Sequence, residues 1–243
     1  MTWANRARLF FGLIVVVAIA LGATLILSQR QAEVTSESAS IKSQSYSVGS
    51  DYAGTVVASK AKTGDTVNAG EPIMTIQSDS LAHDIQNKVV VPKSAAYRIG
   101  SAGALTLLAT QSGVVDRVGA QVGGFVSAGS AVATVDRANS LFVSAQFNLD
   151  PYDFSRIEPG ATVDLILPNQ HRLEGTVYRI RVTTVSGKAH ASIEVHSAQL
   201  RRGTSNGLVA PGTPIQAVLH LRDDGLLGGL RQDVLGLWHQ MGL

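Results

Sequence analysis

A serine flanked by glycines is the pattern in this chain that most resembles a catalytic motif. Residues 203–207 read Gly-Thr-Ser-Asn-Gly, and Asp223 and His239 follow in the order of a hydrolase triad. A nucleophile of this type needs an apolar strand before it and a helix after it. Here polar residues precede it and a predicted strand follows. We therefore assign a Ser-Asn-Gly turn, predict no catalytic residue, and predict that the protein is not an enzyme.

The cysteine and histidine content of the chain does not indicate a metal site. The chain has no cysteine, which excludes disulfides, thiolate metal sites and cysteine nucleophiles. His190 and His196 share one face of a predicted strand, but at about 3.3 Å per residue they lie roughly 20 Å apart, too far to bind one ion. We predict no metal and no cofactor, and we interpret the histidines as surface residues.

The excess of positive charge belongs to the N-terminus. Residues 1–30 contain Arg6, Arg8 and Arg30 and no acidic residue, which leaves 17 basic and 18 acidic residues in the rest of the chain. Between Arg8 and Arg30, residues 9–27 form an apolar run long enough for a helix to cross about 30 Å of hydrocarbon. The two arginines that precede the run predict a cytoplasmic N-terminus, with the bulk of the chain outside.

Residues 1–30 are therefore predicted to be a cytoplasmic stub and a single-pass anchor in the cytoplasmic membrane. A cleaved signal peptide is the alternative, because Ala18 and Ala20 form an A-x-A pattern, although the apolar run continues past that point. Residues 31–50 are rich in serine and are predicted to be a linker, with one weak strand over residues 34–41.

An internal repeat is the most informative feature of the sequence. Residues 54–76 align with residues 113–135, with eight identities in 23 positions. Each copy predicts short strands separated by glycine turns, and two copies facing one another could form a small sandwich. The glycines that we assign to the turns are Gly54, Gly64, Gly70, Gly113, Gly123 and Gly129.

The two copies, GTVVASKAKTGDTVNAGEPIMTI and GVVDRVGAQVGGFVSAGSAVATV, resemble the half-motifs of the biotinyl/lipoyl-like fold. Two such halves behind an N-terminal membrane helix are similar to the HlyD-type membrane fusion proteins, or periplasmic adaptor subunits. The resemblance implies a split lipoyl-like barrel-sandwich hybrid over residues 51–138. It also implies an adaptor role in an efflux or export complex, with an inner-membrane transporter of the ABC type as the expected partner.

A small β-barrel domain is predicted over residues 139–222. Residues 141–182 are similar to the barrel domain of the same family, with a strand, a short acidic helix, a Pro-Gly turn and two further strands. Independently, alternation of apolar and polar residues predicts strands with one buried face, so that the fold class is mainly β. The predicted strands are residues 162–167, 175–181, 191–196 and 215–221.

The insertion between the halves, residues 78–110, departs from the family. Many adaptors carry a long helical hairpin here, but two helices sharing this length could each span no more than about 20 Å. We predict two helical turns over residues 81–87 behind Ser80 as N-cap, then a hairpin of strands over residues 97–99 and 105–108. The arm that would reach an outer-membrane channel is missing.

A lipoyl-like fold raises the question of a modified lysine. Carrier domains present this lysine at a tight hairpin that joins the halves, whereas here the insertion joins them. Lys88 and Lys93 lack that setting, and Lys60 and Lys62 lie within the first half. We predict no lipoyl or biotinyl group.

The C-terminal residues 223–243 predict an amphipathic helix. This helix either packs on the β-domain of its own chain or docks on a membrane partner or the bilayer interface, with Trp238 as anchor. Its apolar face is Leu226, Leu230, Val234, Trp238 and Met241.

A positive bias in the barrel indicates a solvated face, an acidic partner or lipid headgroups. No aromatic platform accompanies it, so we predict no nucleic-acid partner. The basic residues are Arg172, Arg179, Arg181, Lys188, Arg201 and Arg202.

These patterns together predict a membrane-anchored, non-enzymatic adaptor that couples to a transporter and forms a collar or conduit as a homo-oligomer. The alternative is an extracytoplasmic structural or protein-interaction β protein without a transporter. An acyl-carrier subunit of an enzyme would need a modified lysine and a cytoplasmic location, which the predicted anchor contradicts.

Overall fold

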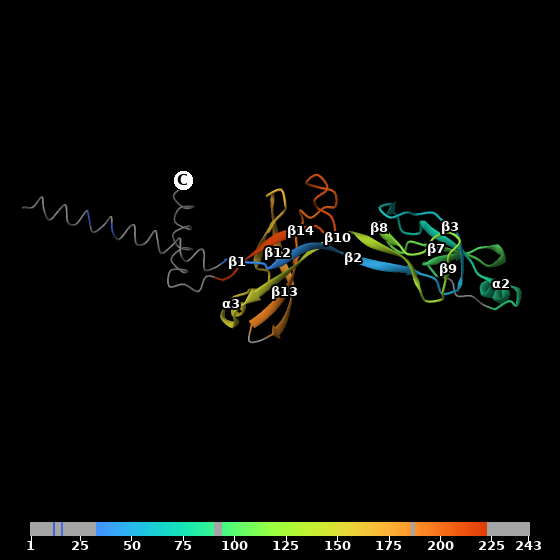
Figure 1. Ribbon diagram of the computed structural model, residues 1–243, viewed down its shortest axis with the longest axis horizontal. Coiled ribbons are helices and arrows are strands. Elements are labelled where there is room, and N and C mark those ends of the chain that lie inside the picture. The colour runs from blue at the N-terminus through green and yellow to red at the C-terminus, as the bar shows by residue number, and fades with distance from the viewer. Residues whose placement is uncertain (1–11, 13–15, 17–32, 90–93, 186–187, 223–243) are drawn as a thin grey trace, which may run out of the picture. The chain divides into compact units, whose positions relative to one another are not determined.

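The computed structural model describes Gly12, Val16 and residues 33–89, 94–185 and 188–222, and side chains within these ranges except 183–189 (Figure 1). The described chain is mainly β and falls into two compact units. Unit 2 comprises Lys42–Leu141, and unit 1 comprises the described residues on either side of it.

Unit 2 is a sandwich in which the two copies of the repeat exchange strands. In one layer β3 (Gly54–Ser59) of the first copy pairs with β5 (Pro72–Gln77) and with β9 (Phe125–Val126) of the second copy. In the other layer β8 (Gly113–Val118) pairs with the first part of β10 (Ala131–Leu149) and with β4 (Thr66–Val67) of the first copy. Each copy therefore completes the layer that the other copy begins.

The two copies of the repeat also contribute equivalent residues to the core of unit 2. Equivalent positions of the two copies are apolar and buried, because both copies turn the same face of each strand inward. Each copy by itself buries too little surface to fold, whereas the two together form one continuous core. The buried equivalent pairs are Val56 and Val115, Val67 and Val126, Ile73 and Val132, Met74 and Ala133, and Ile76 and Val135.

The insertion extends unit 2 rather than projecting from it as a long arm. It begins with α2 (Asp79–Gln86), about 12 Å of helix at 1.5 Å per residue. The N-cap is Ser78, not the predicted Ser80, because the Ser78 hydroxyl accepts a hydrogen bond from Leu81 N at 3.3 Å. The predicted hairpin is present as β6 (Tyr97–Ile99) and β7 (Ala104–Leu108), and β7 pairs with β5.

Unit 1 is a barrel whose strand path closes on itself. The path runs from β14 through β11, β12, β13, β10 and β2 and returns to β14. The short helix α3 (Pro151–Ser155) follows β10, and β1 (Glu33–Thr35) pairs with β14. Alternate residues of these strands are fully buried, as expected for a small barrel filled by side chains. The bounds are β2 (Ser38–Gly49), β11 (Thr162–Ile166), β12 (Arg172–Val185), β13 (Lys188–His196) and β14 (Pro214–His220).

Most of the linker predicted over residues 31–50 is strand, because β1 and β2 occupy residues 33–35 and 38–49. The weak strand predicted over residues 34–41 overlaps the end of β1 and the start of β2. Ala39, Ile41 and Val48 of β2 are buried, and the residues between them are mostly small and polar. This is the period of a half-buried strand. The high serine content conceals it, because serine on the outer face of a strand resembles serine in a flexible linker.

Candidate functional site

The Gly-Thr-Ser-Asn-Gly segment forms a turn. Ser205 and Asn206 have φ of 52° and 58°, and Gly203 and Gly207 have φ of 83°. Within the described residues, no strand leads directly into this segment and no helix follows it. Asp223 and His239 lie outside the described residues. The strand-turn-helix setting of a serine nucleophile is therefore not present around Ser205.

The histidines weighed in the sequence do not form a ligand cluster within the described residues. Across the described chain, no group of three or more His, Asp or Glu side chains is placed to hold a metal ion. His190 is exposed on β13, whereas His196 contacts two aromatic rings. Lys60 follows β3 and donates its backbone N–H to Ile73 O at 2.8 Å, and Lys93 lies outside the described residues.

Glycine turns join one copy of the repeat to the other through matching hydrogen bonds. Gly64 N donates to Val115 O and Gly123 N donates to Val56 O, each at 2.8 Å, and each pair of equivalent atoms lies 59 residues apart. Gly64 and Gly123 have φ of 94° and 87°, which favours glycine. Gly70 and Gly129 have φ of 82° and 78°. These turns are the points at which the two copies meet.

Gly54 and Gly113 differ from the turn assignment made for all six glycines. They are the first residues of β3 and β8 and do not have positive φ. A Cβ at Gly54 would overlap Gln77 O, and one at Gly113 would overlap Asp136 O. Glycine is required at these two positions because another backbone approaches closely, not because the chain turns there.

Three of the exposed large apolar side chains of unit 2 belong to the two copies of the repeat. Val57, Val122 and Phe125 are 50%, 61% and 72% exposed. Val57 lies in β3, Phe125 lies in the neighbouring β9, and the residue after Val122 donates its N–H to Val56 O. The equivalent positions of the other copy, 59 residues away, carry Asp116, Thr63 and Thr66, all exposed. The fold therefore accepts polar residues at these places.

Unit 1 carries a cluster of arginine and aromatic side chains on the outside of β12, β13 and β10. Arg179 and Arg181 form ion pairs with Glu194, with N–O distances of 3.4 Å and 3.1 Å. The His196 ring meets the Tyr178 ring edge-on at 4.7 Å and stacks on Phe142 at 6.3 Å. We call Tyr178, Arg179, Arg181, Glu194 and His196 the bulge face, because the strand register shifts between Val177 and Arg179.

The sequence indicated the positive bias of the barrel but not this cluster. Tyr178 lies beside Arg179 in the sequence, and strict alternation would place the two side chains on opposite faces of β12. The bulge places both on the outer face, and no sequence signal marks it. Of the other basic residues weighed for the same role, Arg172 lies at the start of β12, and Arg201 and Arg202 lie in the loop after β13. The side chain of Lys188 is outside the described ones.

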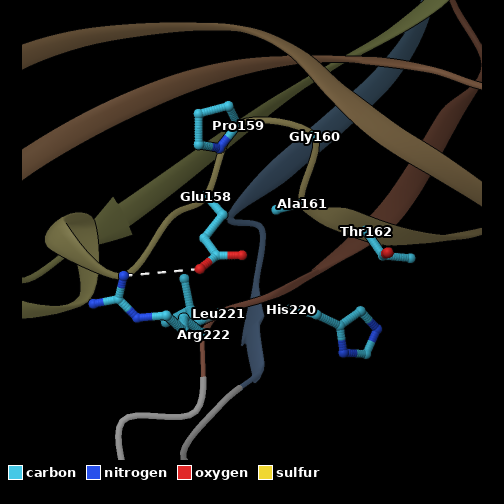
Figure 2. A pocket seen from close by; sticks show the side chains of 8 residues that line it. All are labelled: Glu158, Pro159, Gly160, Ala161, Thr162, His220, Leu221 and Arg222. Carbon is cyan, nitrogen blue, oxygen red and sulfur yellow. Dashed lines mark ion pairs between the residues drawn. The ribbon is translucent and has the colours of Figure 1, made fainter.

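An open pocket of about 280 Å³ lies at one end of unit 1, lined by residues 158–162 and 220–222 (Figure 2). The Glu158 carboxylate points toward the Arg222 guanidinium, at 3.7 Å, and both side chains are more than half exposed. His220 lies between Asp164, at 3.3 Å from Nε2, and Glu33, at 3.8 Å from Nδ1. The lining is polar and open to solvent, which suits surface contact better than an enclosed ligand.

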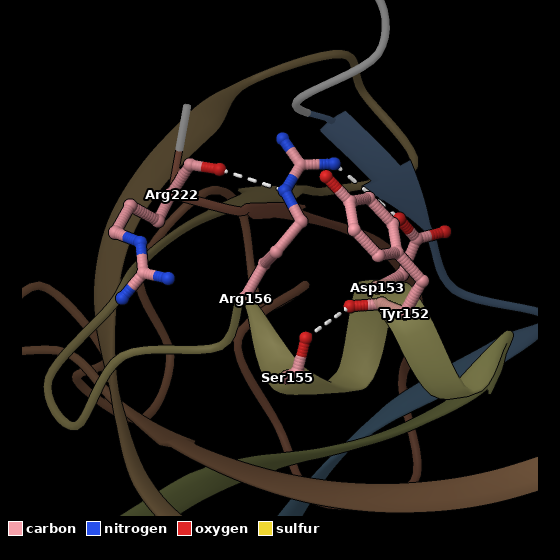
Figure 3. Close-up of polar contacts among 5 residues, drawn as sticks. All are labelled: Tyr152, Asp153, Ser155, Arg156 and Arg222. Carbon is pink, nitrogen blue, oxygen red and sulfur yellow. Dashed lines mark hydrogen bonds and ion pairs between the residues drawn. The ribbon is translucent and has the colours of Figure 1, made fainter. Parts of the chain in front are cut away.

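Arg156 connects α3 to the segment that follows β14, beside this pocket. Its side chain is almost wholly buried, and its Nε donates to Arg222 O at 2.8 Å while Nη1 lies 3.4 Å from Asp153 Oδ1 (Figure 3). The guanidinium also lies 5.6 Å from the centre of the Tyr152 ring. Arg222 N donates back to Arg156 O at 3.0 Å. The residue after α3 is thus tied to the chain that leaves β14.

Two predicted helices lie outside the described residues. These are the anchor, of which only Gly12 and Val16 are described, and the C-terminal helix with Leu226, Leu230, Val234, Trp238 and Met241. Where the chain is described, no helix is both long enough and apolar enough to cross a membrane.

Comparison with known proteins finds similarity in structure only. No protein-family model matches the sequence, and no curated protein matches it. The solved structure of ZneB from Cupriavidus metallidurans covers 78% of this chain and 98% of its own, with a TM-score of 0.57 and 16% identity. A MacA–MexA chimera with the Pseudomonas aeruginosa MexA α-hairpin domain covers 79% and 83%, with a TM-score of 0.57 and 13% identity.

MacA from Actinobacillus actinomycetemcomitans is also similar, with a TM-score of 0.52 and 12% identity over 78% of each chain. These proteins are membrane fusion, or periplasmic adaptor, proteins. The described chain therefore has the fold of the membrane fusion proteins, as its repeat and barrel patterns indicated.

Proposed function

We propose that this protein is a membrane-anchored, non-catalytic adaptor subunit of an efflux or export complex. The observation that carries the proposal is the order of the parts in one chain. A predicted membrane helix is followed by a sandwich of exchanged repeat strands and by a closed barrel. The likeness in fold to ZneB and MacA supports the same role.

The proposed mechanism is structural. The predicted helix of residues 9–27 anchors the chain in the cytoplasmic membrane, with the folded units outside. The units assemble as a homo-oligomeric collar or conduit on an inner-membrane transporter, and we take this partner to be an ABC permease with its ATPase. The lipoyl-like unit 2 would act through its surface and not through a modified lysine.

The short insertion defines the kind of complex. The helix α2 spans about 12 Å, and the β6–β7 hairpin is part of a layer of unit 2. An adaptor of this shape suits a system without an outer-membrane channel, or one in which another chain supplies the arm. Cryo-electron microscopy of the complex tests this, because a contact between residues 78–110 and an outer channel would contradict it.

The function itself is tested by loss and restoration of transport. Deletion of the gene should lower export of the transported compound, or tolerance of it, and the full-length gene should restore both. A chain without residues 1–30, exported by a cleavable signal peptide, should restore less if anchoring matters. Unchanged export and tolerance after deletion would contradict the proposal.

A further inference from the structure

The first and last strands of unit 1 place two chain segments at the same edge of the barrel. β1 and β14 pair in antiparallel register, with Glu33 opposite His220. Glu33 is the first residue of β1, and His220 is the last residue of β14. The segment that precedes β1 and the segment that follows β14 therefore both start from this edge, next to the pocket that His220 lines (Figure 2).

This edge of the barrel lies near the membrane if residues 9–27 form the proposed anchor. Glu33 is six residues after Leu27, and Leu226, the first residue of the predicted apolar helix face, is six residues after His220. Six residues of extended chain span at most about 20 Å. The predicted C-terminal helix can therefore reach the bilayer surface beside the anchor while β1 and β14 keep their pairing.

The C-terminal residues 225–243 combine many large apolar side chains with little charge. Arg231 and Asp233 are the only charged side chains among them, and they balance one another. On the predicted helix, Gln232 lies opposite the centre of the apolar face. Glycine at five of the 19 positions weakens the helix in water, so that it should form only where its apolar face is covered.

The described surface of the barrel is a poor cover for this apolar face. Among residues 33–41 and 142–222, the exposed large apolar side chains are Tyr152 on α3 and Tyr178 and Val182 on β12. The pocket at the edge itself is lined mainly by polar and charged groups, including the ion pair of Glu158 and Arg222. Charged groups that lose water against leucine side chains gain no compensating hydrogen bond.

We propose that residues 225–243 bind the surface of the lipid bilayer beside the anchor, with the apolar face toward the acyl chains and Trp238 at the level of the headgroups. Tryptophan is enriched at this depth because its ring is apolar and its N–H is polar. The chain then contacts the membrane on both sides of unit 1, before β1 and after β14. Two attachments on neighbouring strands restrict rotation of this edge over the bilayer, which one attachment does not. The inference rests on the proposed anchor.

Fluorescence of Trp238 tests the inference in the full-length protein. The chain has two tryptophans, so Trp3→Phe leaves Trp238 as the only one. This variant is reconstituted into phosphatidylcholine vesicles, with bromine on the lipid acyl chains either near the headgroup or near the chain end. Bromine near the headgroup should lower Trp238 emission about twofold or more, and bromine near the chain end should lower it less, because the helix lies in the interface.

A matched pair of substitutions in the same Trp3→Phe background shows whether the apolar face makes the contact. Val234→Asp places a carboxylate within that face and should abolish most of the quenching, because the charge would have to leave water. Gln232→Asp adds the same charge on the opposite face and should leave the quenching unchanged. Thermal unfolding of unit 1 should be the same in both variants, since neither residue belongs to the barrel strands.

The inference is overturned if brominated lipid leaves the emission of Trp238 unchanged, or if Val234→Asp and Gln232→Asp have equal effects. Protection of an unquenched Trp238 from aqueous acrylamide would then indicate a helix covered by its own barrel. Alkaline carbonate extraction of the same vesicles tests the anchor separately. A chain that resists extraction but shows no quenching rejects the second membrane contact alone, whereas a chain released by carbonate rejects the anchor as well.

Discussion

Arg156 shows at the scale of one residue how the barrel end is held. A buried guanidinium is costly unless it is hydrogen-bonded, and here a backbone carbonyl, a carboxylate and an aromatic ring surround it. The carbonyl belongs to Arg222, beyond the end of β14, and Asp153 and Tyr152 belong to α3. One side chain therefore joins two elements that are far apart in the sequence.

We expect Arg156→Ala to lower the free energy of unfolding by about 2–3 kcal/mol, because the hydrogen bonds of a buried guanidinium are lost and the part-buried Arg222 carbonyl loses its donor. Urea unfolding measures the change. Arg222→Ala is the matched control, since its side chain is exposed and its ion pair with Glu158 should contribute less than about 1 kcal/mol. Equal effects of the two substitutions would contradict the role given to Arg156.

The exposed apolar residues of unit 2 make a second residue-scale prediction. Phe125→Thr should leave the free energy of unfolding within about 0.5 kcal/mol of the wild type, because the side chain is exposed and Thr66 occupies the equivalent place in the other copy. Val126→Thr, one residue away but buried, should cost about 1–3 kcal/mol through its buried hydroxyl. A large loss in Phe125→Thr, measured by urea unfolding, would mean that the fold itself needs this ring.

At the scale of the element, glycine spacing made the repeat visible and predicted the strands β3, β5, β8 and β9. Their exchange between layers was not predictable from local patterns, because the pairing of β9 with β3 joins residues about 70 positions apart. Most of the strand β2 was missed for a different reason, and only its start lies within the weak strand predicted over residues 34–41. Its outer face is rich in serine, and the partners that bury its inner face come from much later in the chain.

The candidate surfaces were likewise predictable only in part from the sequence. The arginines of the bulge face were visible as a charge bias, whereas Tyr178 joins them only through a bulge that depends on cross-strand register. Arg156 had no sequence signal, since its hydrogen-bond partner is a main-chain carbonyl. Local composition therefore predicted which elements form, and tertiary pairing decided which side chains meet.

The duplicated geometry of unit 2 makes a prediction at the scale of the element. Gly54→Ala and Gly113→Ala should destabilise unit 2 by similar amounts, about 2 kcal/mol or more, because each new Cβ would overlap a carbonyl of the neighbouring strand. Gly64→Ala, where a Cβ has open space, should cost only the left-handed conformation, about 1 kcal/mol. Thermal unfolding compares the three, and unequal effects of Gly54→Ala and Gly113→Ala would break the proposed equivalence.

At the scale of the whole molecule, the proposed function depends on the arrangement of the parts. The sandwich and the barrel are small modules that bury separate cores, and β2 and β10 each contribute residues to both units. The predicted anchor precedes β1 by only a few residues. If residues 9–27 span the membrane as proposed, β1 should therefore lie close to the membrane surface.

Removal of residues 1–30 tests the anchor. The truncated chain, secreted with a cleavable signal, should move from the membrane fraction to the soluble extracytoplasmic fraction and keep the thermal unfolding temperature of the full chain. Alkaline carbonate extraction followed by immunoblotting measures the distribution. Full-length protein that carbonate releases from membranes would argue for the cleaved signal peptide instead.

The central claim is that this chain is the adaptor of a membrane transporter, and its most direct test is copurification. The tagged full-length protein is cross-linked in intact cells, solubilised from membranes, and analysed by quantitative mass spectrometry. The account predicts a multispanning permease with its ATPase at a constant ratio to the adaptor, absent from a control that carries the tag on an unrelated membrane anchor. An adaptor recovered without any transporter, both with and without cross-linking, would contradict it.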